Sequence, residues 1–427
     1  MKGPRTLGWF ICLALVSTSP AGADVVTDWN AIATQTIISP LASPPRGGGA
    51  AFLDFAMVHL AMHDAIQAFE HRYEPYGDPI PNAAGSPVAA AASAAHAVLA
   101  ERFPAQAGSL YTTFLSYLTG LGLQDDPGVG VGQDAAAQII SLRMGDGSFP
   151  SNPEIFTGGT QPGEWRPTPP AFAPMAVPWL GDVVPFALMS STQLFAPPPP
   201  HLTSGLYARD YNEVKALGRA TNSSRTQEQT DLALFYSDNL IVQGQRTLRG
   251  VVSSLHDVGT NARLLALANL AASDAVITSW NAKRHYNYWR PITAIREGEN
   301  DGNPETIGDP TWVPMIATPA YPDYTSGANN FTAAFTRTLA LYFGDKKTFT
   351  VTSTPVNQTK TYERFSDQAA DMVNVRIYQG IHFRTADEVA RIQGTLAANW
   401  AFAHTLRPVH GSWWWLAWWW RVTGASH

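Results

Sequence analysis

Residues 261–280 read NARLLALANLAASDAVITSW, and this stretch determines the fold class. Its leucines, alanines and valine recur three and four positions apart, which is the period of an α-helix and not the alternation of a strand. A helix that is apolar nearly all round lies in the middle of a core, because each of its faces must be covered. We therefore predict a central buried helix with other helices packed around it.

The rest of the chain shows the same periodicity. Thr226 with Gln229, and Thr385 with Glu388, are capping-box patterns at two helix starts, and Gly344 ends a third helix. The predicted fold is all-α, a large helical bundle. Its other helices are expected over 50–69, 93–103, 134–144, 207–220, 227–240, 329–343, 362–378 and 387–404.

The composition narrows the class of protein. The chain has 427 residues, of which 45% are hydrophobic, so it can bury a sizeable core. Its net charge is −6 and it has no long basic run, which argues against a nucleic-acid or anionic-membrane partner. The one cysteine, Cys12, lies in the N-terminal segment described next. A mature chain without that segment has no disulfide and no catalytic cysteine.

The first 23 residues have the pattern of a secretory signal. Lys2 and Arg5 form a charged start, residues 7–17 are apolar, and Ala21-Gly22-Ala23 is a small-residue cleavage site before Asp24. An apolar stretch of this length is shorter than the roughly 20 residues that span a bilayer. We expect a secreted or periplasmic protein with no stable membrane span. An uncleaved anchor is the alternative.

The sequence suggests four regions. They are a signal peptide (1–23), an N-terminal helical region (24–200), a C-terminal helical region that carries the chemistry (201–408) and a tail (409–427). A stretch rich in Pro, Gly and aromatics at 147–200 forms the seam, and its aromatics favour an ordered, wrapping connector over disorder. The tail has six tryptophans between Trp413 and Trp420. It is either an interface-seeking or a flexible end, and we assign it no function.

Lys283 and Arg290 form the first candidate site segment, directly after the apolar helix. The helix end brings these cations to the interior. Pro291 disfavours the α conformation at Arg290, so the chain is expected to leave the helix there and both cations can converge on one anion. Two surface cations are the alternative.

The second segment is Ser326-Gly327, at the start of the helix predicted over 329–343. A Ser-Gly helix start offers a hydroxyl and free backbone N–H groups at the positive end of the helix dipole, where anions bind. Ser and Gly are also ordinary residues at helix starts, so this segment alone is a weak signal.

The third segment runs from Arg376 to His382. Arg376 continues an apolar stripe of Phe365, Ala369 and Met372 at helical spacing, and a buried arginine needs an anionic partner. Gly380 is a plausible helix end that turns the chain so that His382 points back. Together the segments supply two arginines, a lysine, a hydroxyl, a backbone N–H and an imidazole, a set that suits a phosphate-like oxyanion.

The order and spacing Lys283-x6-Arg290-Pro291, Ser326-Gly327 and Arg376-x5-His382 resemble the signature shared by vanadium-dependent haloperoxidases and type 2 phosphatidic acid phosphatases. The resemblance implies an all-α bundle with vanadate as cofactor. It implies that Lys283, Arg290, Ser326, Gly327 and Arg376 bind the oxyanion. His382 would be the axial vanadium ligand in a peroxidase, or the phosphorylated nucleophile in a phosphatase. Trp280, Tyr321, Asp323 and His285 are further pocket candidates.

Three positions depart from the family pattern. Thr325 replaces a proline, and Val375 replaces a serine. Ala328 stands where the family has a histidine that acts as general acid/base, and losing such a proton donor typically costs ~10²–10⁴-fold in rate. His285, Asp323 and Asn329 are nearby candidates for a substitute.

Three functions follow from this resemblance. The first is a secreted vanadium-dependent haloperoxidase whose substrates are hydrogen peroxide and halide. The second is an acid phosphatase acting on a phosphate ester. The third is a catalytically weak oxyanion-binding homologue, which Ala328 motivates. The sequence leaves the oligomeric state open.

His59 and His63 lie four residues apart on a predicted helix, with Asp64 beside them. This spacing can bind a metal. No further ligand cluster is near in sequence, so packing or hydrogen-bonding roles are favoured.

Overall fold

The computed structural model describes residues 24–409; the signal segment and the tryptophan-rich tail lie outside the described residues. Helices dominate the described part, as predicted, and a two-stranded antiparallel sheet is the exception. The helices in its first half are α1 (Val25–Ile37), α2 (Ala51–Glu70), α3 (Pro87–Arg102), α4 (Ala107–Leu121), α5 (Gly128–Leu142), α6 (Gly205–Leu217), α7 (Gln227–Phe235) and α8 (Leu240–Val252). The second half contains α9 (Val258–Tyr286), α10 (Pro291–Arg296), α11 (Gly327–Phe343), β1 (Lys346–Ser353), β2 (Gln358–Arg364), α12 (Phe365–Tyr378) and α13 (Arg384–His404).

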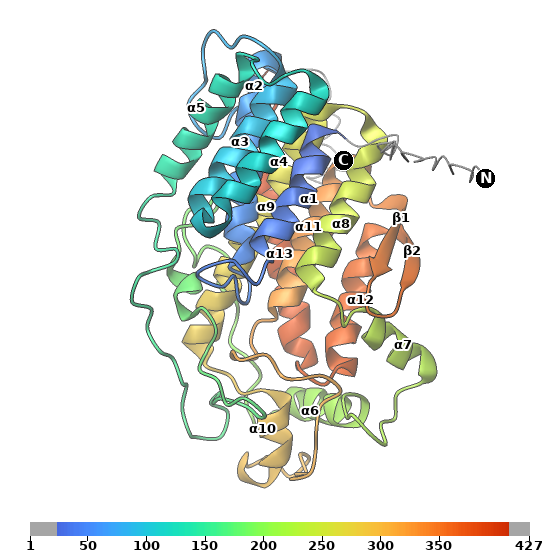
Figure 1. The fold of residues 1–427 in the computed structure, drawn as a ribbon. Coiled ribbons are helices and arrows are strands. Elements are labelled where there is room, and N and C mark those ends of the chain that lie inside the picture. The colour runs from blue at the N-terminus through green and yellow to red at the C-terminus, as the bar shows by residue number, and fades with distance from the viewer. Residues whose placement is uncertain (1–23, 410–427) are drawn as a thin grey trace, which may run out of the picture.

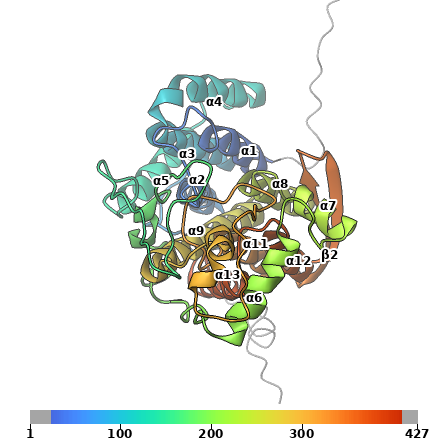
Figure 2. The same cartoon turned by 90° about the horizontal axis from the view of Figure 1, so that it is seen from below.

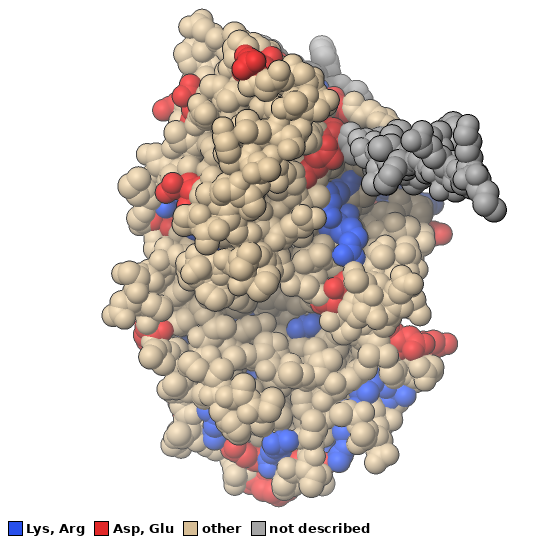
Figure 3. All heavy atoms as spheres, viewed as in Figure 1, with Lys and Arg blue, Asp and Glu red and all other residues tan. Residues whose placement is uncertain are grey.

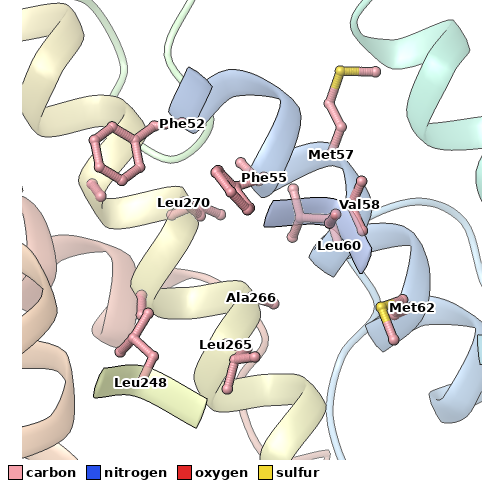
Figure 4. Close-up of a cluster of buried hydrophobic side chains, with 14 of the residues drawn as sticks. Phe52, Phe55, Met57, Val58, Leu60, Met62, Leu248, Leu265, Ala266 and Leu270 are labelled. Atoms are coloured by element: carbon pink, nitrogen blue, oxygen red, sulfur yellow. The ribbon is translucent and has the colours of Figure 1, made fainter. Parts of the chain in front are cut away.

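Helix α9 is the central element, as its sequence predicts. Its N-cap, Asp257, accepts a hydrogen bond from the backbone N–H of Thr260 at 2.9 Å, and Asn287 ends it in the left-handed conformation with φ of 46°. Seen from below, α9 lies between α2 on one side and α11 and α13 on the other (Figure 2). Leucine and alanine side chains of α9 meet phenylalanine and methionine side chains of α2 and Leu248 of α8 in the core (Figure 4).

One large cluster of buried hydrophobic side chains extends through both halves of the chain. The long helices run roughly alongside one another, while α6 and α10 cover one end of the bundle and the hairpin β1–β2 lies at its side (Figure 1). Where α11 meets α13, a Cβ at Gly394 would lie 2.0 Å from the backbone oxygen of Asn330. The absence of a side chain at Gly394 therefore permits the close approach of these two helices.

The stretch 147–200 is largely without regular structure yet closely packed, as an ordered connector requires. Trp165 is fully buried within it. The carboxylate of Asp274 on α9, itself buried, accepts hydrogen bonds from the backbone N–H groups of Phe186, Ala187 and Leu188 at 2.6–2.8 Å. A buried carboxylate that accepts three backbone N–H groups fixes the connector against α9. The boundary between two regions at residue 200 remains a prediction.

Several local predictions were wrong. Residues 362–364 belong to β2 and not to a helix, because 346–364 form a hairpin with alternating buried and exposed side chains in β1. The stretch 227–240 divides into α7 and the start of α8, where Asn239 is a new N-cap. Thr385 with Glu388 is not a capping box: α13 begins at Arg384. The capping box of Thr226 with Gln229 and the helix end at Gly344 are confirmed.

Candidate functional site

The three cations of the candidate site are all buried. Lys283 and Arg290 are fully inaccessible, and Arg376 is 6% exposed. Lys283 is in the last turn of α9, Arg290 is the extended residue before α10, and Arg376 is in the last turn of α12. The alternative of two surface cations is therefore excluded.

The loop before α11 holds two of these cations. Lys283 Nζ donates to the backbone oxygens of Pro322 at 2.7 Å and Asp323 at 3.1 Å. Arg290 Nε donates to the backbone oxygen of Tyr321 at 2.7 Å. Both cations also lie within 4.9 Å of the centre of the Tyr321 ring, a distance at which a cation is attracted to an aromatic face.

The loop that carries Arg290 is fixed from outside by the connector. The backbone N–H of Trp165 donates to the oxygen of Asn287 at 2.7 Å, and that of Trp289 donates to the oxygen of Gly163 at 2.9 Å. Arg290 is thus positioned by backbone pairing with a distant segment, which the local sequence does not reveal.

Two guanidinium donors in this group have no partner. Arg290 Nη2 and Arg376 Nε are buried and make no hydrogen bond within the described part of the chain. Arg376 Nη1 donates to Gln379 Oε1 at 2.6 Å, so the side chain is held while its Nε stays available. A buried donor without an acceptor costs ~1–3 kcal/mol, and more when it is charged. The two free donors therefore indicate an anionic occupant.

Ser326 and Gly327 supply the start of α11 next to these cations. Ser326 is the N-cap, fully buried, but its side chain makes no capping bond, so the first backbone N–H groups of α11 are not used by the cap. The indole of Trp280 covers Gly327, where a Cβ would lie 2.8 Å from Trp280 Cζ3. The helix start therefore adds backbone donors and positive potential in a site closed by an aromatic ring.

His382 is buried between a carboxyl and a guanidinium. Its Nδ1 lies 2.8 Å from Asp323 Oδ1, and its Nε2 lies 3.1 Å from Arg290 Nη1. Burial, together with Arg290 and Lys283, lowers the pKa of His382 well below its usual value. The imidazole is therefore neutral, and with its proton on Nδ1, the nitrogen beside Asp323, it has a lone pair on Nε2, as a metal ligand or a nucleophile requires.

Gly380 makes this position of His382 possible. It has φ of +79°, in the left-handed region, directly after α12. The turn allows the backbone oxygen of Ile381 to accept from Arg290 Nη1 at 2.5 Å and brings His382 back to the arginines. The predicted helix end and reversal at Gly380 are confirmed.

Not all of the remaining pocket candidates lie in the cluster of cations. Trp280, Tyr321, Asp323 and Asn329 contact the cluster, and Ala328 is at the partly exposed edge of the α11 start. His285 does not join it. Its side chain is exposed and packs edge-to-face on Phe195, with ring centres 4.9 Å apart. His285 follows Lys283 by two positions, about 200° round α9, so it faces away from the interior that Lys283 enters.

Sequence reasoning missed Asp387. Its carboxyl is fully buried in the first turn of α13 and accepts a hydrogen bond from Asn329 Nδ2 at 2.8 Å. The same amide nitrogen lies 3.3 Å from Ser326 Oγ. An acid in the first turn of a helix has an ordinary interpretation as a favourable dipole partner, which hides it in the sequence.

The described residues contain no group of three His, Cys, Asp or Glu side chains that could hold a metal ion. His59 Nε2 is 2.7 Å from Asn30 Nδ2, and His63 Nε2 is 3.1 Å from the backbone oxygen of Glu74. Both histidines therefore have hydrogen-bonding roles. Within residues 24–409 no helix has the length and apolarity needed to cross a membrane. On the face in Figure 3 basic and acidic side chains are interspersed, without a broad basic patch.

The sequence is similar to known proteins over its second half. The family described as VCPO second helical-bundle domain matches residues 263–411. A vanadium chloroperoxidase from Curvularia inaequalis is 34% identical over 95 residues, which are 20% of this chain. The matched part is only 15% of that relative's own length.

The fold is similar to solved structures over most of its length. The first bacterial vanadium-dependent iodoperoxidase superposes with a TM-score of 0.75 over 90% of this chain and 98% of that chain, at 23% identity. The holo-type bacterial vanadium-dependent chloroperoxidase superposes with a TM-score of 0.71 over the same shares, at 16% identity. At such low identity these likenesses establish the fold.

Proposed function

The chain belongs to the superfamily of vanadium-dependent haloperoxidases and type 2 phosphatidic acid phosphatases, and we propose that it is a vanadate-dependent enzyme that oxidises halide with hydrogen peroxide. One observation carries the proposal. Two buried arginines keep unused N–H donors beside a neutral histidine whose Nδ1 faces a carboxyl. Donors for oxygen atoms and one imidazole lone pair are the groups that a vanadate ion needs.

The residues present fit this ion by their chemistry. Lys283 has used two of its three N–H donors on carbonyl oxygens, and Arg290 Nη2 and Arg376 Nε are free. These three, with the Ser326 hydroxyl and the Gly327 N–H, would hold the oxygens, and His382 Nε2 would bind the vanadium. The cations would also offset the negative charge of the ion, which has few other counterions in the interior.

Vanadate, when bound, supplies the Lewis acid that activates hydrogen peroxide toward halide. The protein groups bind, orient and exclude water. Arg290 Nη1, which lies 3.1 Å from His382 Nε2, would turn to an oxygen of the ion, and the Asp323 carboxyl beside Nδ1 would position the imidazole ring. The rings of Trp280 and Tyr321, whose centres are 5.0 Å apart, cover the cations and keep the local dielectric low.

A phosphomonoester hydrolase is the second candidate. The lowered pKa of His382 favours it as well, because a neutral imidazole has a lone pair that can attack phosphorus as well as bind vanadium. Vanadate separates the two, since it activates the peroxidase and inhibits the phosphatase. The third candidate is a protein that binds the ion but turns over neither substrate. It is supported by Ala328, which stands where the family has a histidine.

The test is one titration with two assays. Purified protein receives increasing vanadate and is assayed with hydrogen peroxide and bromide or iodide for halogenation of a phenolic dye, and separately for hydrolysis of p-nitrophenyl phosphate. We expect halogenation to rise with vanadate, to vanish in His382→Ala and to remain in His285→Ala, whose side chain is exposed. Phosphate release inhibited by vanadate, without halogenation, would establish the second candidate instead.

We also propose that the protein acts outside the cytoplasm. The support is the signal pattern of residues 1–23, which lies outside the described residues. N-terminal sequencing of protein exported by its own leader should begin at Asp24. A mature protein that still starts at Met1 and stays with the membrane fraction would favour the uncleaved anchor.

A further inference from the structure

Asp387 is a buried acid that the family signature does not explain. Its side chain is fully inaccessible in the first turn of α13. Oδ1 accepts from Asn329 Nδ2 at 2.8 Å, whereas Oδ2 is buried and has no hydrogen-bond partner among the described residues. An unpartnered oxygen in the interior needs either a proton and an acceptor, or a donor from an occupant.

The groups that face Asp387 belong to the oxyanion site. From α11 come Ser326, whose hydroxyl interacts with the carboxyl, and Asn329, which bridges the two. The charged groups that act on it are Arg376 from α12, Lys283 from the end of α9, Arg290 before α10, Arg384 at the start of α13 and Asp323 from the loop before α11. Asp387 therefore lies on the α11 side of the site, the side on which Ala328 leaves out the usual histidine.

The other candidates for that histidine's role are occupied or misplaced. His285 is exposed on another face of α9. Asp323 also has buried oxygens without a hydrogen-bond partner among the described residues, but its Oδ1 lies 2.8 Å from Nδ1 of His382, the ring that binds the ion in the proposed function. Asn329 has no titratable proton. Among the candidates considered, Asp387 alone combines a titratable proton, an unpartnered oxygen and a hydrogen-bonded link to Ser326.

We propose that Asp387 takes over the general acid/base role that the family assigns to a histidine at position 328, with Oδ2 as the atom that shares a proton with the bound oxyanion. This inference rests on the proposed function, because it needs an oxyanion held by the arginines. In its acid form Asp387 donates its proton to an oxygen of the ion or of a departing group. That oxygen gains the proton, and the carboxylate left behind faces the positive charges of Arg376 and Lys283.

The electrostatics support this assignment. Burial, followed by the negative charge of Asp323, raises the pKa of Asp387 well above its usual value. Asp387 therefore still holds its proton at pH values where an exposed aspartate has lost it. A carboxylic acid that keeps its proton near neutral pH can donate, as a general acid must.

Inorganic phosphate is the probe, because its binding needs no activity. Calorimetric titration in two buffers with different ionisation enthalpies gives both Kd and the number of protons exchanged on binding, at several pH values. The full mature chain is compared with Asp387→Asn, which keeps the shape and a donor but cannot titrate, and with Asp387→Ala. Asp210→Asn is the matched control, since Asp210 is another buried acid, on α6, that accepts a hydrogen bond from the first turn of α13, the Thr385 N–H, at 2.9 Å.

We expect Asp387→Asn to bind phosphate within about 10-fold of the wild type while losing one titrating group from the proton exchange. Asp387→Ala should bind about 10- to 100-fold more weakly, the cost of one hydrogen bond to a charged group. Asp210→Asn should keep the wild-type proton exchange. Proton exchange unchanged in Asp387→Asn overturns this inference and leaves the oxyanion site standing. A wild-type chain that binds neither phosphate nor vanadate overturns the proposed function, and this inference with it.

Discussion

The bundle contains two buried polar clusters, and they differ in how completely their atoms are paired. We call the first the bundle cluster; it consists of Asn30, His59, Gln245, Arg249 and Asn269. Asn30 Nδ2 is 2.7 Å from His59 Nε2 and donates to Gln245 Oε1 at 2.8 Å, and Arg249 donates to Asn30 Oδ1 at 2.6 Å. Gln245 donates in turn to Asn269. His59 Nδ1 is its one buried side-chain atom without a partner within the described residues.

The second is the site cluster, formed by Lys283, Arg290, Asp323, Ser326, Asn329, Arg376, His382 and Asp387. It is also buried, yet Arg290 Nη2, Arg376 Nε, Asn329 Oδ1, both carboxyl oxygens of Asp323 and Asp387 Oδ2 lack hydrogen-bond partners among residues 24–409. A fully paired network stabilises one arrangement of the core, whereas an incompletely paired one is costly until something fills it. The difference teaches that several unpaired atoms gathered in one cluster, rather than polarity or burial alone, distinguish the site cluster from the bundle cluster.

The largest expected effect is on phosphate binding, which should depend on the site cluster and not on the bundle cluster. Arg376→Met removes a buried cation and one free donor but keeps a long apolar side chain on the stripe of α12. We expect the Kd for phosphate to rise about 100-fold or more, because a charge-assisted pair is lost. The melting temperature should stay the same or rise, since a buried charge is replaced by an apolar group. Calorimetric titration and thermal unfolding measure both. A marked loss of stability with unchanged binding would reverse the assignment.

The second prediction concerns the bundle cluster. Asn30→Ala leaves the buried partner atoms of Gln245, His59 and Arg249 unpaired, so the free energy of unfolding should fall by about 3 kcal/mol. Phosphate binding by the folded fraction should be unchanged. Urea unfolding followed by titration checks this. Asn212→Ala is the control, because Asn212 is exposed in the middle of α6 and its amide donates to the backbone oxygens of Ala208 and Glu305.

The third prediction concerns pH. Burial, followed by the charge of Arg249, lowers the pKa of His59 to about 3, while an unfolded histidine has a pKa of ~6.5. The folded state thus resists protonation, and the contribution of His59 is complete above pH ~6.5 and is lost as the pH falls toward 3, at ~1.4 kcal/mol per pH unit.

His59→Gln can still bond to Asn30 but cannot titrate. The free energy of unfolding of this variant should therefore depend on pH less steeply than that of the wild type between pH 6 and 4. Urea unfolding at several pH values gives this free energy for both proteins. The difference between the two curves isolates the histidine from the buried acids, whose raised pKa values act in the opposite direction. Parallel curves would show that His59 is protonated in the folded protein.

The smallest expected effect is at Ala328. If Asp387 already carries the proton, then Ala328→His adds a second donor to the site cluster and changes the rate of either assay by less than about 10-fold. The same replacement in Asp387→Asn should restore more activity than it adds to the wild type. A gain of ~10²-fold or more in the otherwise unchanged chain would mean that the proton donor is simply missing.

Much of the fold was predictable because its signals are local. The apolar circumference of 261–280 predicted the central helix, and the stripe ending in Arg376 predicted a buried arginine. The hairpin 346–364 was not predicted, because residues 346–361 were assigned to no element and 362–364 to the helix that follows. The break between α7 and α8 was missed because Asn239 was not recognised as an N-cap.

The part of the site that follows from the spacing of residues along the chain was predictable. Lys283, Arg290, Ser326, Arg376 and His382 were expected to converge, and they lie together. Asp387 and the pairing of Trp165 with Asn287 depend on contacts between distant segments. The contact of Asn329 with Asp387 forms where α11 packs on α13, near Gly394, and the contact of Trp165 with Asn287 forms where the connector packs on the end of α9, so no local pattern reveals either.

The most direct test of the central claim is the stoichiometry of vanadate binding by equilibrium dialysis of the mature chain and of His382→Ala. If the site cluster is built for an oxyanion with His382 as the axial ligand, the wild type binds one vanadate per chain. His382→Ala then loses stoichiometric vanadate but still binds phosphate through the arginines. Equal vanadate binding by both chains, or none by the wild type, would contradict the account.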